Sequence, residues 1–359
     1  MRENSRMPSP SVPPSAPLLV EHRVSLRAHN TFGLPAVAQT LVHIRSEADL
    51  RRVVDHPELG RAPKLVLGGG SNVVFTHDVD AVVLKIEIPG LRLLEATAQG
   101  WLVEVGAGES WHAAVAWTQA QGFPGLENLA LIPGSTGAAP VQNIGAYGVE
   151  LKDRFHSLDT LDLVTGRLVT LTGADCRFGY RDSVFKQTGF GGLAGKSVIT
   201  RVRLWLPRPW QPVLGYVDLE RKMAETGNSQ PQANTVFDWV CAIRRAKLPD
   251  PAVIGNAGSF FKNPVVTPEQ CKDIIGRDPE IVHYPMTDGN VKLAAGWLID
   301  ACGWKGKTIG GAGVYEKQAL VLVNRGDAIG AEVVTLARAI QESVYGRFGI
   351  RLEPEPVII

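Results

Sequence analysis

The sequence has few cysteines, and their spacing gives them no shared role. Only four occur in 359 residues: Cys176, Cys241, Cys271 and Cys302 are far apart, with no Cys-x-x-Cys pair and no histidine at zinc-ligand spacing. This pattern disfavours both a disulfide framework and a structural metal site. We therefore expect no metal and a reducing, cytoplasmic location.

Long hydrophobic runs and an excess of charge are also missing. No apolar run approaches the roughly 18 residues that a membrane-spanning helix needs, and residues 1–21 lack the apolar stretch of a secretory signal. The formal net charge of +1 gives no electrostatic reason to expect binding to nucleic acid or to an anionic membrane. The proline- and serine-rich residues 1–21 are expected to form a disordered tail.

Three common nucleotide-binding and catalytic motifs are absent. The glycines at 189–192 have no strand immediately before them, so they do not make a dinucleotide-binding Rossmann turn. Gly-Lys-Ser at 195–197 and Gly-Lys-Thr at 306–308 match the end of a phosphate-binding P-loop, but Phe190 and Ala301 occupy the place of its first glycine. No serine lies in Gly-x-Ser-x-Gly, which argues against a triad hydrolase.

What is present predicts a chain of two or three mixed domains. With 45% hydrophobic and 20% charged residues the composition is ordinary for a globular protein, and the length exceeds that of one growing core. The stretch 64–75 predicts a buried strand that enters a glycine turn, and 101–110 is strand-like. The stretches 156–172 and 197–207 alternate apolar and polar positions around a turn at 165–166, as in an antiparallel hairpin. Residues 208–250 look helix-rich.

Helix signals are clearest where a cap precedes an apolar period. Ser46 caps a helix that begins at residue 47, and a capping box with proline at the first helical position starts another at Thr267. The pattern at 291–303 predicts a helix closed by glycine. The last helix ends at Gly349.

Two glycine-rich loops, at 68–72 and 133–148, have backbone N–H groups that a ligand can approach closely. A glycine turn after a strand presents its N–H groups to an anion at close range, because no Cβ stands in the way. The two loops together could hold a pyrophosphate. Each loop alone is also compatible with ordinary turn chemistry.

The stretch GNAGSFFKNP at 255–264 surrounds one serine with aromatic and polar residues. A buried hydroxyl must find a hydrogen-bond partner or lose free energy. Ser259 therefore either lies in a polar pocket or bonds its own backbone in a tight turn between strands.

Seven motifs in register strongly resemble the UDP-N-acetylenolpyruvoylglucosamine reductase (MurB) family, with matching order and spacing from about residue 28 to 356. The motifs are NTFGLPA at 30–36, LGGGSNVVF at 67–75, GLENLALIPGSTGAAPVQNIGAYGVEL at 125–151, CRFGYRDSVFK at 176–186, GNAGSFFKNP at 255–264, KLAAGWLID at 292–300 and RLEPE at 351–355.

The resemblance implies an α+β fold in which a two-lobed FAD-binding domain, of the vanillyl-alcohol-oxidase-like type, carries a smaller α+β substrate-binding domain. After the tail at 1–21, the expected parts are a first FAD-binding lobe at 22–97, a second at 98–208, the substrate-binding domain at 209–345 and a C-terminal segment at 346–359 that returns to the active site.

The resemblance also implies the reaction. NADPH reduces noncovalently bound FAD, leaves, and is replaced in the same pocket by the enolpyruvyl ether of UDP-N-acetylglucosamine, which becomes UDP-N-acetylmuramate for peptidoglycan, and thus for cell shape and division. Hydride from flavin N5 adds to C3, and negative charge builds on C2 and the carboxylate. Arg181 and Glu355 would hold that charge, and Ser259 would protonate C2 as the general acid.

The remaining family positions would bind the ligands. Tyr180, Tyr216, Lys247 and Asn263 match substrate-binding positions, and the Tyr216 segment resembles the longer subgroup, in which this loop closes over substrate. The FAD-contacting positions lie in the two glycine loops: Gly68, Gly69, Gly70, Ser71, Asn72, Pro133, Gly134, Ser135, Gly137, Asn143, Gly145 and Ala146. The only partner expected is a small UDP-sugar, and we expect a monomer.

The residues alone also allow purely structural roles for Arg181 and Glu355, and other functions for the chain. Arg181 beside Asp182 could form a surface ion pair, and Glu355 could be solvated near the chain end. Pro356, where a small apolar residue is usual, could shift the carboxylate. The alternative functions are another FAD-dependent oxidase on this scaffold and a nucleotide-binding protein without redox chemistry.

Overall fold

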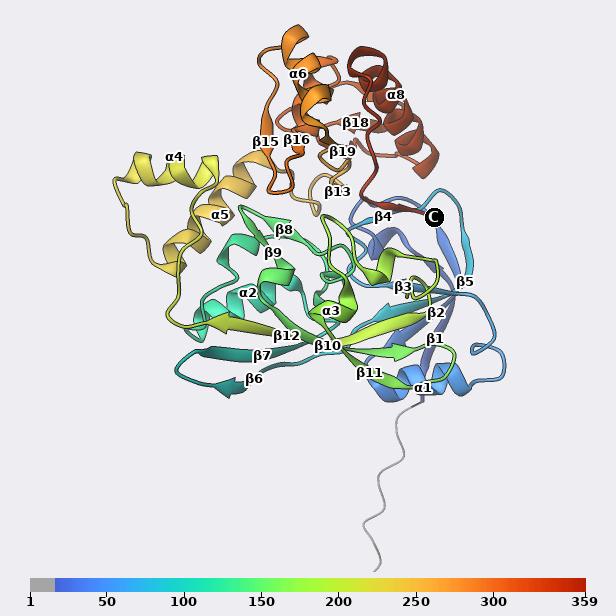
Figure 1. Cartoon of the computed structure of the whole chain (residues 1–359). Helices are drawn as coiled ribbons and strands as arrows, with labels where there is room; N and C mark the ends of the chain where they lie inside the picture. The colour runs from blue at the N-terminus through green and yellow to red at the C-terminus, as the bar shows by residue number, and fades with distance from the viewer. Residues whose placement is uncertain (1–16) are drawn as a thin grey trace, which may run out of the picture.

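The computed structural model describes residues 17–359, so most of the expected tail at 1–21 lies outside the described residues. Its last part is ordered, because β1 (Leu19–Ser25) pairs antiparallel with β2 (Val37–Ile44). Three α+β parts follow along the chain, with the third on top of the other two (Figure 1).

The first lobe is a four-stranded sheet in the order β1-β2-β5-β3. Its β5 (Val79–Ile86) pairs in parallel with both β2 and β3 (Lys64–Leu67), so the three parallel strands end at one edge. The helix α1 (Glu47–Asp55) covers one face through Leu50 and Val53. As predicted, Ser46 caps α1, accepting from the Asp49 N–H.

The second lobe is an antiparallel five-stranded sheet in the order β11-β10-β12-β7-β6. Its strands are β6 (Leu91–Ala96), β7 (Gly100–Gly106), β10 (Phe155–Asp162), β11 (Leu168–Thr172) and β12 (Ser197–Pro207). The predicted hairpin is β10–β11. Because β6 pairs with β7, the second lobe starts before the expected boundary at residue 97.

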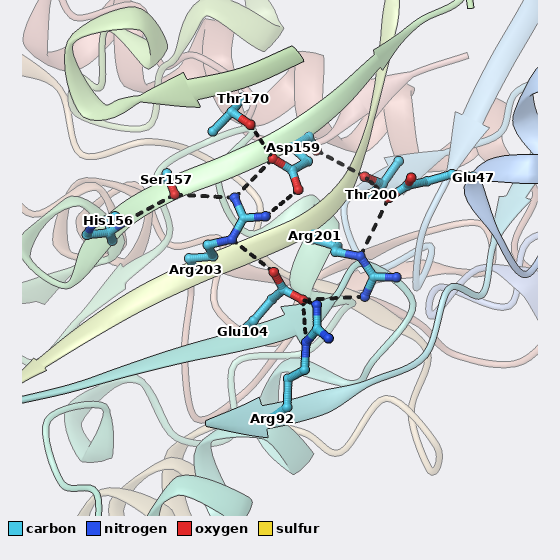
Figure 2. A network of polar contacts seen from close by, with 10 residues as sticks. All are labelled: Glu47, Arg92, Glu104, His156, Ser157, Asp159, Thr170, Thr200, Arg201 and Arg203. Carbon is cyan, nitrogen blue, oxygen red and sulfur yellow. Dashed lines mark hydrogen bonds and ion pairs between the residues drawn. The ribbon is translucent and has the colours of Figure 1, made fainter. Parts of the chain in front are cut away.

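One face of this second sheet carries a network of paired charges (Figure 2). Glu104 on β7, only 2% exposed, accepts hydrogen bonds from Arg92 at 2.5 Å and Arg203 at 2.9 Å, and it forms an ion pair with Arg201 at 3.6 Å. Arg203 also donates to Asp159 on β10. Arg201 reaches Glu47 of α1 at 3.5 Å, so the network ties the second lobe to the first.

The third part combines two small sheets with three helices (Figure 1). A sheet in the order β13-β19-β18-β17 and another in the order β14-β16-β15 share its core with α6, α7 and α8. The bounds are β13 (Asn256–Ser259), β14 (Val265–Val266), α6 (Pro268–Arg277), β15 (His283–Pro285), β16 (Val291–Leu293), α7 (Ala295–Ala301), β17 (Thr308–Ile309), β18 (Ala312–Val314), β19 (Val321–Asn324) and α8 (Gly330–Phe348).

The helix predicted at 291–303 is shorter in the structure and begins at residue 295. Residues 291–293 form β16, which pairs with both β14 and β15, and only residues 295–301 are helical. Tertiary pairing therefore overrides local helix propensity there. The capping box at Thr267 and the glycine stop at Gly349 are confirmed.

Two helices that follow the expected domain boundary at residue 209 pack against the second lobe instead of the third part. Apolar residues of α4 (Val217–Thr226) and α5 (Ala233–Lys247), including Leu219 and Val240, belong to the hydrophobic core of the second lobe. Conversely Phe348, Ile350 and Leu352 belong to the core of the third part. Only the last few residues leave that core.

The chain end returns to the first lobe, where β20 (Val357–Ile358) pairs in parallel with β4 (Val73–Val74) directly after the first glycine loop. The other short elements are α2 (Trp111–Ala120), α3 (Gly173–Cys176), β8 (Gly145–Ala146), β9 (Val149–Glu150) and the 3-10 helices η1 (Arg27–His29), η2 (Glu127–Leu129), η3 (Thr136–Ala138), η4 (Leu151–Asp153) and η5 (Val184–Lys186). No helix within residues 17–359 has the length and apolar character to cross a membrane.

Candidate active site

In the first glycine loop, residues 68–72, three carbonyl groups are hydrogen-bonded within the described chain, whereas the N–H groups of residues 69–72 are not. The Gly68 carbonyl accepts from Lys85 Nζ, the Gly70 carbonyl from the Thr31 N–H at 3.0 Å, and the Asn72 carbonyl from the Val357 N–H at 2.9 Å. Within the described chain, the N–H groups of residues 69–72 donate no hydrogen bond. Such a set of unused N–H groups on glycine backbone is typical of an anion-binding loop.

The second glycine loop adds two hydroxyl groups that lack partners. Ser135 Oγ and Thr136 Oγ1 are buried without a hydrogen-bond partner among the described residues. The N–H groups of Gly134 and Ser135 are also unused there. Buried polar groups are rarely left unpaired, and those that are call for a ligand or water. Two hydroxyl groups and two N–H groups beside the first loop therefore have no acceptor within the described chain.

The two loops touch, and glycine makes the contact possible. A Cβ on Gly68 would lie 2.3 Å from Ser135 Oγ, and a Cβ on Gly69 would lie 2.8 Å from the Gly134 Cα. A cavity of about 760 Å³ also opens beside Gly69, between residues 27–33 of the first lobe and 250–255 of the third part. The loops fit a diphosphate, and the cavity is within the size range of cofactor sites.

Arg181 is held by a tight turn in the left-handed backbone region, with a φ of 53°. Gly179 and Asp182 bridge the turn with hydrogen bonds of 3.0 and 3.3 Å, and Lys186 Nζ donates to the Arg181 carbonyl at 3.1 Å. The guanidinium donates to the Gly145 carbonyl at 3.1 Å and to Glu355 at 3.2 Å. Arg181 therefore does not form the alternative surface ion pair with Asp182.

Glu355 is buried, although it lies near the chain end. Its N–H donates to the Phe260 carbonyl at 2.8 Å, and its carbonyl accepts from Asn72 of the first glycine loop at 3.2 Å. Burial raises the pKa of the carboxyl, although the cations of Arg181 and Lys186 oppose that shift. The group is therefore suited to stay protonated at higher pH than an ordinary glutamate.

Ser259 lies at the end of β13, immediately before the residue that bonds Glu355. A bulge separates the pairs Asn256–Val323 and Ser259–Val321, and Gly258 takes a φ of +70° within it. The serine hydroxyl donates no hydrogen bond to its own backbone in the described chain. Of the two readings open from the sequence, the turn-bonded hydroxyl is therefore wrong.

Tyr180 and Asn263 connect this site to the third part. Asn263 Oδ1 accepts from the Ala295 N–H at 2.9 Å, and the Asn263 backbone lies near the Tyr180 hydroxyl, where it acts to lower the pKa against the larger effect of burial. The ammonium of Lys292 lies 4.1 Å from the centre of the Tyr180 ring. Burial raises the pKa of the Tyr180 hydroxyl, so this group remains a neutral hydrogen-bond donor.

Tyr216 packs edge-on against Tyr147, with ring centres 5.2 Å apart. Burial raises the pKa of Tyr216 to about 12. Tyr147 in turn lies near Arg244, whose positive charge opposes the rise that burial causes in the Tyr147 pKa. The guanidinium of Arg244 is enclosed, and its Nε has no partner among the described residues. Arg244 is close enough to Arg181 for the two charges to repel.

Lys247 lies at the edge of this cluster. Its ammonium pairs with Asp218 at 2.6 Å, beside a groove between α4 and α5. Asp218 lies close enough to Tyr216 and Tyr147 to help raise the pKa of both hydroxyls. The structure therefore brings Lys247 to the tyrosine cluster only through its acidic partner.

Asn143, one of the predicted FAD-contacting residues, is engaged within the protein. Its side chain is consumed by the protein: Nδ2 donates to Glu150 and to the Gly179 carbonyl, both at 3.0 Å, and Oδ1 accepts from the Lys152 N–H at 3.0 Å. This amide braces the turn that carries Arg181 and has no free polar atom for a cofactor.

Sequence reasoning missed Arg244, Lys292, Tyr147 and Lys186. Arg244 lies one helical turn before Lys247, so its face could have been assigned from the helix period. No local signal distinguishes the other three. Within residues 17–359 no group of three or more His, Cys, Asp or Glu side chains is placed to hold a metal ion.

The two lobes and their glycine loops define a flavoprotein fold, and comparison with known proteins agrees. The FAD binding domain model matches residues 38–172, and the model of the UDP-N-acetylenolpyruvoylglucosamine reductase C-terminal domain matches residues 250–359. The predicted fold, a two-lobed FAD-binding domain with a smaller α+β domain, is confirmed.

Full-length relatives give the particular family. The UDP-N-acetylenolpyruvoylglucosamine reductase of Burkholderia vietnamiensis is 55% identical over 356 residues, covering 98% of this chain and 100% of the relative. That of Paraburkholderia phymatum is 52% identical over 351 residues, covering 97% and 100%. The crystal structure of the Thermus caldophilus reductase is 27% identical with a TM-score of 0.64, covering 95% and 99%. The chain belongs to the UDP-N-acetylenolpyruvoylglucosamine reductase family.

Proposed function

We propose that this chain uses FAD and NADPH to reduce the enolpyruvyl ether of UDP-N-acetylglucosamine to UDP-N-acetylmuramate. The observation that carries the proposal is the contact between Arg181 and Glu355, which are 174 residues apart in sequence and 3.2 Å apart in space. The main chain of Glu355 is bonded to the residue after Ser259. These two contacts support the proposal that Arg181, Glu355 and Ser259 act in one site.

The glycine loops would hold the cofactor. FAD supplies hydride transfer, from NADPH to C3 of the enolpyruvyl group. The unused N–H groups of residues 69–72, together with Ser135 and Thr136, would bind its diphosphate. Asn72 bonds the Glu355 carbonyl, so the cofactor loop and the catalytic carboxyl are mechanically joined.

Arg181 and Glu355 would stabilise the charge that builds on the substrate. When C3 gains a hydride, electron density moves to C2 and the adjacent carboxylate. A guanidinium oriented by Gly145 binds that carboxylate, and a protonated Glu355 donates a hydrogen bond to the developing enolate. Burial raises the pKa of Glu355 above that of an ordinary glutamate, which favours the protonated form.

Ser259 would complete the addition by moving one proton. Its Oγ–H gives a proton to C2, and the oxygen regains one from water before the next turnover. An alcohol is a weak acid, but a fixed position beside the forming carbanion compensates through proximity. The hydride and the proton together account for the two hydrogens of the product.

The tyrosine cluster would bind the rest of the substrate. Tyr180, Tyr216 and Asn263 line the contact between the second lobe and the third part, and Lys247 suits the UDP diphosphate once substrate competes with Asp218. The partly exposed Tyr216 segment would close over the bound sugar. NADPH would use the same pocket earlier in the cycle, and we expect a cytoplasmic monomer.

The test is a Ser259→Ala variant studied in two half-reactions by stopped-flow flavin absorbance. Reduction by NADPH should stay near the wild-type rate, whereas reoxidation by the enolpyruvyl substrate should slow by about 10²-fold or more. Ser343→Ala, on α8, is the matched control and should change neither rate. An equal loss in both half-reactions would exclude Ser259 as the proton donor.

A further inference from the structure

The Gly68–Gly69 peptide is flanked by residues that rotate easily, yet one side chain fixes it. Lys85 lies on β5, next to the end of β3, and its ammonium donates to the Gly68 carbonyl. We propose that Lys85 is a positioning residue for the FAD diphosphate, because it locks this peptide with the Gly69 N–H facing the cofactor. The inference rests on the FAD site of the proposed function and deepens it.

Peptide geometry carries the first step. In a trans peptide the C=O and the following N–H point in opposite directions. The bond from Lys85 to the Gly68 carbonyl therefore directs the Gly69 N–H away from the lysine, and that N–H donates no hydrogen bond within the described chain. Without the lysine the unit could flip at low cost, since glycine populates both signs of φ.

The Gly70–Ser71 peptide, the second one after Gly68–Gly69, is fixed in the same way but by different means. The Gly70 carbonyl accepts from the Thr31 N–H at 3.0 Å, so the Ser71 N–H is also directed away from its own anchor. Thr31 uses its main-chain N–H, which truncation of its side chain leaves in place. In the loop 68–72 only the Gly68 carbonyl is held by a side chain, which makes Lys85 the point at which the loop can be tested.

Charge acts in the same direction as geometry. Lys85 is partly buried, and burial lowers its pKa, while Glu87 on the same face of the sheet opposes that shift. A cation directly behind a loop of outward-facing N–H groups raises the potential at the anion site. Lys85 would thus favour the diphosphate both by orienting a donor and by its field.

The test compares Lys85→Met with Lys64→Met in protein stripped of FAD and then titrated with it. Lys64, on the adjacent β3, is a good control because its partly buried ammonium also holds carbonyl groups, those of Gly60 at 2.7 Å and Ala62 at 2.9 Å, but none in the glycine loop. Lys85→Met should raise the Kd for FAD about tenfold to a hundredfold, whereas Lys64→Met should leave it unchanged.

Two further readouts separate positioning from general damage. ADP, which carries a diphosphate but no flavin, should compete with FAD for the wild type and lose affinity for Lys85→Met by a similar factor. The melting temperature of the FAD-free Lys85→Met protein should stay near that of the FAD-free wild type, with a smaller rise on adding FAD. Lys85→Arg, which keeps a cationic donor, should recover most of the affinity.

An unchanged Kd for FAD in Lys85→Met would overturn the inference, as would an equal loss in Lys64→Met. If Lys85→Met does not fold, loss of FAD affinity in a folded Lys85→Arg protein would also count against it, because that variant keeps the donor and the charge. A wild-type protein that binds no FAD would instead refute the proposed function.

Discussion

The molecule holds two clusters of buried charge that behave in opposite ways. In the network on the second sheet (Figure 2), hydrogen bonds from Arg203 and Thr170 outweigh burial and lower the pKa of Asp159. In the candidate active site, burial outweighs the nearby cations and raises the pKa of Glu355. Both carboxyls face an arginine, so the presence of a partner does not decide the outcome.

The difference lies in how many donors each carboxyl receives. Asp159 accepts two hydrogen bonds from Arg203 and one from Thr170. Among residues 17–359 the Glu355 carboxyl accepts only from Arg181 Nε, at 3.2 Å, while Arg181 Nη2 donates to the Gly145 carbonyl. A saturated carboxylate is a structural element, whereas an under-coordinated one can gain and lose a proton.

The largest expected effect comes from removing the under-coordinated carboxyl. Glu355→Ala should slow reoxidation of the flavin by the enolpyruvyl substrate by about 10²- to 10⁴-fold, because both a hydrogen-bond donor and a fixed partner of Arg181 disappear. Stopped-flow measurement of both half-reactions checks this, with NADPH reduction as the internal reference. Asp159→Asn is the control in the other cluster and should leave both rates near wild type.

The pH dependence of the same step sharpens the comparison. In the proposed mechanism Glu355 acts in its protonated form, and burial raises its pKa above the ordinary value for glutamate. The rate should therefore be fully present below that raised pKa and be lost as pH rises through it. Glu355→Gln keeps a neutral donor, so its slower rate should not fall over the same pH range. A wild-type rate that increases with pH there would contradict a protonated Glu355.

Substitutions in the network on the second sheet should change the free energy of unfolding and not the rates of the two half-reactions. Arg203→Met leaves Asp159 and Glu104 short of donors, and we expect a loss of about 2 kcal/mol in the free energy of unfolding, since Arg92 and Arg201 still neutralise Glu104. Because the pKa of Asp159 is lowered, its contribution is present at neutral pH and is lost as pH falls through that value. Urea unfolding at neutral and acid pH measures both.

An exposed ion pair supplies the control for this stability experiment. Asp273→Asn breaks a pair with Arg277, four residues along α6, in which both side chains are at least half exposed. The expected loss is only about 0.3 kcal/mol. A loss as large as that of Arg203→Met would mean that the buried network contributes nothing special to the stability of the fold.

Local patterns predicted local structure, and their failures have a physical cause. Caps at Ser46 and Thr267 and the stop at Gly349 depend on a few consecutive residues, so they were predicted correctly. The segment 291–293 became a strand because β14 and β15 flank it. The pattern read at 291–303 contains neither of those neighbours.

The candidate site shows the same limit more strongly. Alone, Arg181 and Glu355 are ordinary charged residues near a turn and a chain end, and only the family resemblance brought them together. Neither that resemblance nor any local pattern indicated Lys85, since its contact with Gly68 crosses from β5 to the end of β3. Asn143 was expected at the cofactor because it lies in a glycine loop, but its amide is used to brace the Arg181 turn.

The most direct test of the account is a single turnover of the wild-type enzyme. Protein loaded with FAD is reduced by NADPH without dioxygen, then mixed either with the enolpyruvyl ether of UDP-N-acetylglucosamine or with dioxygen. We predict fast flavin reoxidation by the UDP-sugar, with one UDP-N-acetylmuramate formed per flavin, and slow reoxidation by dioxygen. A flavin that stays reduced with the UDP-sugar but reoxidises rapidly with dioxygen would contradict the account and indicate an oxidase.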